Sequence, residues 1–206
     1  FAIYLCNMKH PKRLKDGNGR FVANVRGAEG IVSPGRQLEL TTAQEPFAII
    51  LGCSDARVPA EIVFDQGLGD LFVIRVAGNI VAPSQVGSVE FAAERFGTRL
   101  VVVLGHTRCG AIQATVEALQ NPSGNASRNI MSIVDRVRPS VQNLFELGIE
   151  SGSEAFRRQA VKANVRVSVD HLRHGSEVLE QLILNDGLVV AGAEYSVESG
   201  EVEFFD

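Results

Sequence analysis

Residues 47–57 read FAIILGCSDAR, a short apolar run that ends in glycine and is followed at once by chemically reactive side chains. Residues 99–109 read RLVVVLGHTRC and have the same form. Apolar runs of this length, rich in β-branched residues, indicate strands that are buried on both faces of a sheet. Two parallel strands would bring both motifs to the same carboxyl edge, where open α/β sheets hold their ligands.

Together the two motifs supply a set of metal-ligating side chains. Cys53 and Cys109 offer thiolates, His106 offers an imidazole, and Asp55 adds a carboxylate. This donor set suits zinc (Zn²⁺). A lone cysteine after a strand is more often a buried, inert packing residue. The prediction of a zinc site therefore depends on all four positions occurring together at strand ends.

Arg57 indicates which kind of zinc site to expect. Its guanidinium lies two residues beyond Asp55 and can hold that carboxylate in a bidentate pair, away from the metal. Water can then take the fourth zinc position, where zinc lowers its pKa from about 15.7 to about 7. The pattern predicts a catalytic site in which zinc-bound hydroxide attacks a small electrophilic carbon.

Bulk properties limit the class of protein. The 206 residues, 45% hydrophobic and 21% charged, are enough for one well-buried globular domain. A formal net charge of −4 argues against nucleic acid as a partner. The absence of any run of about 18 apolar residues argues against a membrane span. Three cysteines do not suggest a disulfide framework, so we expect a reducing, cytoplasmic location and a packing role for Cys6.

Helical and strand patterns alternate along the rest of the chain. We expect helices over 9–25 with a break at 17–19, over 87–96, over 110–119, and over most of 128–186 with interruptions at Pro139, 148–152 and Gly175. We expect a loop over 27–37, a strand over 71–76, and a closing hairpin formed by 188–193 and 202–205. This order predicts a single α/β domain over 1–206, with a mainly parallel central sheet, an antiparallel edge hairpin, flanking helices and an N-terminal helical arm over about 1–30.

Four motifs carry a resemblance to the β-class carbonic anhydrases. They read CSDARVP at 53–59, FDQGLGD at 64–70, FVIRVAGN at 72–79 and GHTRCGA at 105–111. The resemblance extends over most of the chain, and its zinc motifs are specific to that class. Ala56 departs from the family pattern, which usually has Ser there. Since that position is not a ligand, the change affects a local hydrogen bond.

The resemblance implies the reversible hydration of carbon dioxide to bicarbonate and a proton. It implies zinc on Cys53, His106 and Cys109, with Asp55 and Arg57 as the catalytic pair. It also implies a homodimer or homotetramer whose active sites lie at subunit interfaces. The positions that match the family's substrate pocket, some supplied by the neighbouring subunit, are Gln44, Phe72, Ala77, Phe91 (often Tyr in relatives) and Gly110.

Members of this family differ in the resting state of the site. Some switch between an open form, with Asp55 paired to Arg57, and a closed form in which Asp55 binds zinc. The switching members carry Trp three residues before the first cysteine, where this chain has Ile50. Gln44 is typical of the constitutively open subclass. We therefore expect an open site at neutral pH.

Two other functions remain open on the residues alone. A zinc hydrolase acting on carbon disulfide or carbonyl sulfide would use the same hydroxide attack. A non-catalytic domain with a closed structural zinc site would have four protein ligands and no turnover. The Asp55–Arg57 pair argues against this second alternative, because a structural site has no use for an arginine that holds a ligand away from the metal.

Overall fold

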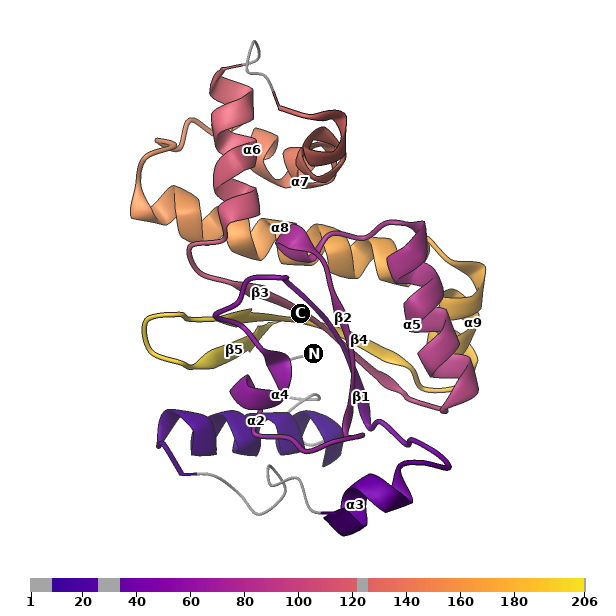
Figure 1. Ribbon diagram of the computed structural model, residues 1–206. Coiled ribbons are helices and arrows are strands. Elements are labelled where there is room, and N and C mark those ends of the chain that lie inside the picture. Colours follow the sequence, from indigo (N-terminus) through magenta and orange to yellow (C-terminus); the bar gives the residue numbers. More distant parts are fainter. Residues whose placement is uncertain (1–8, 26–33, 122–125, 206) are drawn as a thin grey trace.

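The computed structural model describes residues 9–25, 34–121 and 126–205 (Figure 1). Its centre is a five-stranded sheet built from β1 (Ala48–Gly52), β2 (Leu71–Arg75), β3 (Leu100–His106), β4 (Val189–Tyr195) and β5 (Val202–Phe205). The strand order is β2-β1-β3-β4-β5. All neighbouring pairs are parallel except β4 and β5, which form the antiparallel edge hairpin. The predicted α/β fold class is confirmed.

The two central strands explain why the sheet forms where the sequence predicts it. Every residue of β1 and of β3 is buried, as continuous apolar runs between two helical layers require. Ile50 pairs with Val102 and Leu51 pairs with Val103. Because side chains alternate along a strand, the side chains of these two pairs pack into hydrophobic cores on opposite faces of the sheet.

Helices cover both faces of the sheet. They are α2 (Lys9–Val22), α3 (Pro34–Glu39), α4 (Ala60–Val63), the 3₁₀ turn η2 (Ala77–Asn79), α5 (Pro83–Arg95), α6 (Gly110–Gln120), α7 (Arg128–Glu146), α8 (Glu154–His174) and α9 (Glu177–Asn185). Helices α5, α8 and α9 pack on one face, and α2 and α4 on the other. Helices α6 and α7 pack against each other, next to the beginning of α8 (Figure 1).

The predicted break at 17–19 is wrong, because α2 is continuous through it. Gly17 lies so close to α4 that a Cβ there would come within 1.8 Å of the Phe64 carbonyl oxygen. The amide of Asn18 donates hydrogen bonds to the carbonyls of Val63 and Gly200, at 3.1 and 2.8 Å. Gly17 and Asn18 are poor helix formers, but their contacts with distant segments of the chain stabilise the helical conformation at these positions.

Two further predictions about helices need correction. Pro139 does not interrupt α7, which runs through it. Pro139 is exposed, so water can solvate the carbonyl that loses its helical donor there. Residues 34–37, expected in a loop, begin α3, where proline stands at the first helical position and its fixed φ favours helix initiation. The interruptions at 148–152 and at Gly175 are confirmed.

Some predictions fall on residues that the structure does not describe. These are the packing role of Cys6, the loop over 27–33 and most of the N-terminal arm beyond α2. Within the described ranges, no helix has the length and the apolar character needed to cross a membrane.

Candidate metal centre and active site

Three candidate metal ligands converge at the carboxyl edge of the sheet. Cys53 directly follows β1, His106 ends β3, and Cys109 lies just before α6. They meet because β1 and β3 are parallel neighbours. One ligand atom from each residue lies within 4.8 Å of the others, and all three side chains are buried. The structure thus brings together three of the four side chains that the sequence predicts to meet, and the carboxylate of Asp55 lies at the border of the group.

The imidazole of His106 is oriented for metal binding. Its Nδ1 lies 2.8 Å from the carbonyl oxygen of Thr107. Since a carbonyl only accepts, Nδ1 carries the proton and Nε2 keeps a free lone pair. Nε2 is buried and has no hydrogen-bond partner among the described residues. Leaving such an atom unsatisfied is costly, and a metal ion would satisfy it.

The side chains of Cys53 and Cys109 lie next to each other in the cluster. Their interaction lowers the pKa of Cys53 well below its usual range. The same contact and burial raise the pKa of Cys109. A divalent metal would bind both sulfurs as thiolates and release their protons. Two sulfur donors and one imidazole nitrogen fit zinc.

The carboxylate of Asp55 is held by Arg57. Nε of Arg57 donates to Oδ1 at 2.9 Å, and a terminal nitrogen donates to Oδ2 at 2.7 Å. The backbone N–H of Arg57 adds a third hydrogen bond, at 3.0 Å to Oδ1. These contacts lower the pKa of Asp55, so the carboxylate remains ionised at neutral pH. Its Oδ2 lies 3.9 Å from Nε2 of His106, at the border of the candidate metal centre.

Several neighbouring contacts that the sequence analysis missed fix the loop after β1. Arg75 donates to the carbonyls of Cys53 and Asp55, at 3.0 and 2.7 Å. The backbone N–H of Gly78 donates to the Cys53 sulfur at 3.3 Å. Position alone could have indicated Arg75, since it is a charged residue at the carboxyl end of a strand next to β1.

The loop that carries His106 is fixed from the closing hairpin. The hydroxyl of Thr107 donates to Glu198 at 2.6 Å and accepts the N–H of Val197 at 3.0 Å. The hydrogen bond from Thr107, followed by that from Arg108, lowers the pKa of Glu198 to about 2. The last hairpin of the fold therefore braces the loop between two of the candidate ligands.

The predicted substrate positions fall into two groups. Ala77 adjoins Gly78, and Gly110 adjoins Cys109, so both lie next to the metal centre. Gln44 precedes β1 and is therefore at the opposite end of that strand from Cys53. Phe72 pairs with Ile49, three residues or about 10 Å before the carboxyl edge, and packs at a tilt against Phe91 with ring centroids 6.4 Å apart. Within one chain, the second group does not reach the metal centre.

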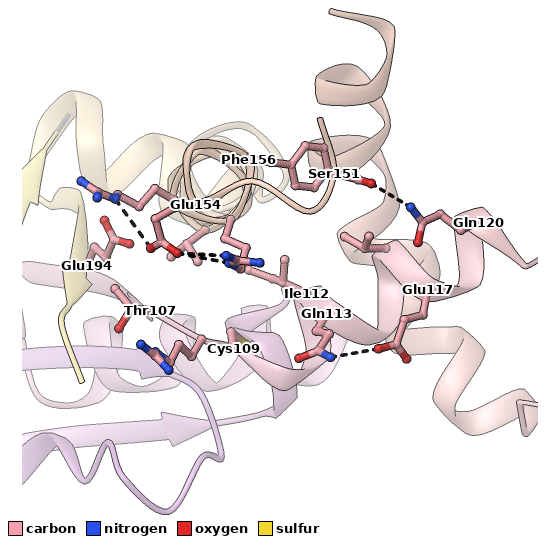
Figure 2. A pocket seen from close by; sticks show the side chains of 15 residues that line it. Thr107, Cys109, Ile112, Gln113, Glu117, Gln120, Ser151, Glu154, Phe156 and Glu194 are labelled. Carbon is pink, nitrogen blue, oxygen red and sulfur yellow. Dashed lines mark hydrogen bonds and ion pairs between the residues drawn. The ribbon is translucent and has the colours of Figure 1, made fainter. Parts of the chain in front are cut away.

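A cavity of about 480 Å³ adjoins Cys109, between α6 and the beginning of α8 (Figure 2). Thr107 and Glu194 lie toward one end of it, and Gln120 and Ser151 toward the other. The side chain of Glu194 is only 8% exposed, and its Oε1 has no hydrogen-bond partner in the described part of the chain. Burial raises the pKa of this carboxyl group. Glu194 belongs to none of the motifs that the sequence offers, although it is the one charged residue in β4.

Known proteins share both the sequence and the fold. A family model described as carbonic anhydrase matches residues 48–202. A carbonic anhydrase of Mycolicibacterium smegmatis is 40% identical over 197 residues, which cover 93% of this chain and 90% of that protein. The crystal structure of the β-carbonic anhydrase CafA of Aspergillus fumigatus superposes with a TM-score of 0.73 at 29% identity, covering 84% of this chain and 81% of CafA. The chain belongs to the β-carbonic anhydrase family.

Other carbonic anhydrases extend the comparison. Carbonic anhydrase 2 of Mycobacterium tuberculosis (strain H37Rv) is 36% identical over 198 residues, 95% of this chain and 91% of that protein. The structure of the β-carbonic anhydrase CcaA superposes with a TM-score of 0.72 at 26% identity. The match covers 97% of this chain and 89% of CcaA. The chain is accordingly an enzyme of the carbonic anhydrase class, a lyase that hydrates carbon dioxide.

Proposed function

We propose that this carbonic anhydrase converts carbon dioxide to bicarbonate and a proton, reversibly, at one zinc ion held by Cys53, His106 and Cys109. The observation that carries the proposal is the convergence of two buried sulfurs with a buried Nε2 that makes no hydrogen bond among the described residues. Three protein donors would leave zinc one further ligand position, which is typical of a catalytic rather than a structural site. Zinc, when bound, supplies a Lewis acid that makes water a nucleophile at neutral pH.

In this proposal Asp55 orients the attacking water. Its lowered pKa means that the carboxylate accepts a hydrogen bond rather than a proton. Oδ2, 3.9 Å from Nε2 of His106, is close enough to the metal centre to accept that bond. Arg57 holds both carboxylate oxygens, which keeps Asp55 off the metal and directs the remaining lone pairs toward the water. This arrangement supports an open site at neutral pH.

The substrate pocket is proposed to need a second subunit. Ala77 and Gly110 line the metal centre from the same chain. Gln44, Phe72 and Phe91 lie away from it, and Phe91 is 54% exposed beside the edge strand β2. In a homodimer or homotetramer, these side chains would complete the site of a neighbouring subunit. Two β-carbonic anhydrases from Sordaria macrospora with the same fold are described as tetrameric.

X-ray absorption at the zinc edge tests the ligand set. We expect two sulfurs at about 2.3 Å and two lighter donors at about 2.0–2.1 Å. The Cys53→Ala variant should lose the metal, whereas Ser54→Ala, a neighbouring change on an exposed side chain, should keep the two-sulfur spectrum. A shell with a different number of sulfurs would refute the proposed ligands.

Sedimentation velocity tests the interface proposal. We expect a dimer or a larger assembly that carries the activity. A variant with the exposed Phe91 changed to Asp should shift toward monomer and lose turnover while keeping zinc. Full activity in a monomeric species would show that the site needs no partner subunit.

A further inference from the structure

The turn η2 supplies a hydrogen bond to one of the proposed zinc ligands. The N–H of Gly78 lies 3.3 Å from the Cys53 sulfur. Gly78 has a φ of +71° and Asn79 has a φ of +44°, so two consecutive residues adopt left-handed conformations. Such a turn is strained at Asn79, and it persists only where surrounding contacts hold it.

Those contacts come from α8. The amide of Asn164 donates to the carbonyl of Gly78 at 2.8 Å, and the hydroxyl of Ser168 donates to the carbonyl of Asn79 at 3.0 Å. Asn164 and Ser168 are 1% and 3% exposed and lie one helical turn apart. Around them, the buried face of α8 is otherwise apolar. Two polar residues in such a face are costly unless they make hydrogen bonds, and both of these bonds go to the same turn.

We propose that Asn164, assisted by Ser168, is a positioning residue that keeps the Gly78 N–H directed at the Cys53 sulfur and so limits how strongly Cys53 donates to the bound metal. The inference rests on the zinc ligation proposed above. Glycine is the residue most free to change its φ and ψ, so without the anchor on its carbonyl Gly78 could change conformation and turn its N–H away from the sulfur. A hydrogen bond to a thiolate ligand draws charge from the sulfur, and such outer contacts tune metal affinity and reactivity.

Cobalt substitution tests the proposal through a spectroscopic signature. Cobalt(II) bound by thiolates has a sulfur-to-metal charge-transfer band in the near ultraviolet. Loss of the hydrogen bond makes the sulfur more electron-rich, so Asn164→Ala should move this band to longer wavelength. Ser168→Ala should move it less, and Ser168→Thr, which keeps the hydroxyl, should leave the wild-type position.

A matched control separates positioning from general loss of packing. Val169 is buried on α8 beside Ser168 and packs into the sheet core. Val169→Ala should lower stability without moving the cobalt band.

The outcomes are distinct. A cobalt band at the wild-type position in Asn164→Ala would overturn the proposal. If that variant does not fold, Ser168→Ala decides in the same way: a shifted band supports the proposal and an unshifted band overturns it. Absence of the charge-transfer band in the wild-type protein would instead refute the proposed thiolate ligation.

Discussion

Replacing Arg57 with alanine tests the proposed role of the Asp55–Arg57 pair. The change removes two of the three hydrogen bonds that hold the Asp55 carboxylate, at 2.9 and 2.7 Å, and leaves only the one from the backbone N–H. Oδ2 is then free to turn toward the metal, since it already lies 3.9 Å from Nε2 of His106. A displacement of about 1 Å in a reacting group costs on the order of 10²-fold in rate. We therefore expect kcat/KM to fall about 10²-fold.

The assay is stopped-flow hydration of carbon dioxide, with zinc quantified in the same sample. Arg57→Ala should keep one zinc per chain, because the three proposed ligands are intact. Arg138→Ala is the matched control: it breaks an arginine–aspartate pair of 2.8 Å, with Asp135 on the surface of α7, and should leave turnover unchanged. Wild-type turnover in Arg57→Ala would remove Arg57 from the mechanism, and loss of zinc would mean that the arginine supports the metal site itself.

Three further predictions concern the metal, the core and the buried carboxyl group. Cys109→Ala should lose zinc and turnover together, measured by elemental analysis and stopped flow; activity without zinc would contradict it. Phe156→Ala, which removes a fully buried ring packed on Phe145, should lower the free energy of unfolding by about 3–5 kcal/mol in urea titrations; a loss below about 1 kcal/mol would mean that the site collapses to fill the space. Burial raises the pKa of Glu194 above its usual value of 4.5, against the opposing charge of Lys162, so the folded state binds this proton more tightly than the unfolded state. Wild-type stability should fall as pH rises from 4.5 through that raised pKa, and Glu194→Gln should lack this part of the pH dependence; identical profiles for the two proteins would refute the assignment.

The part of the fold that could be predicted is the part governed by local pattern. The strands β1 and β3 are continuous apolar runs because both of their faces are buried, and their ends fall within one residue of the prediction. The continuity of α2 could not be predicted, because it depends on contacts of Gly17 and Asn18 with α4 and with the closing hairpin. Local propensity carries no information about such distant contacts.

The candidate site divides in the same way. Cys53, His106 and Cys109 could be brought together from sequence, because parallel strands deliver their carboxyl ends to one edge. The hydrogen bond from Asn164 to the turn η2 could not be predicted. Its acceptor, the carbonyl of Gly78, lies 86 residues earlier, and Asn164 is part of no motif. A signal was nonetheless present: polar residues spaced i, i+4 within an apolar helix face must have buried partners.

The most direct test of the central claim is carbon dioxide hydration by zinc-quantified protein, measured by stopped flow between about pH 6.5 and about pH 9. This range extends above and below the pKa near 7 of water on a catalytic zinc. We predict fast turnover already near neutral pH, with one zinc per chain and Asp55 held by Arg57. Turnover that appears only above about pH 8 would contradict the open site, and no turnover at any pH with zinc bound would contradict the proposed mechanism.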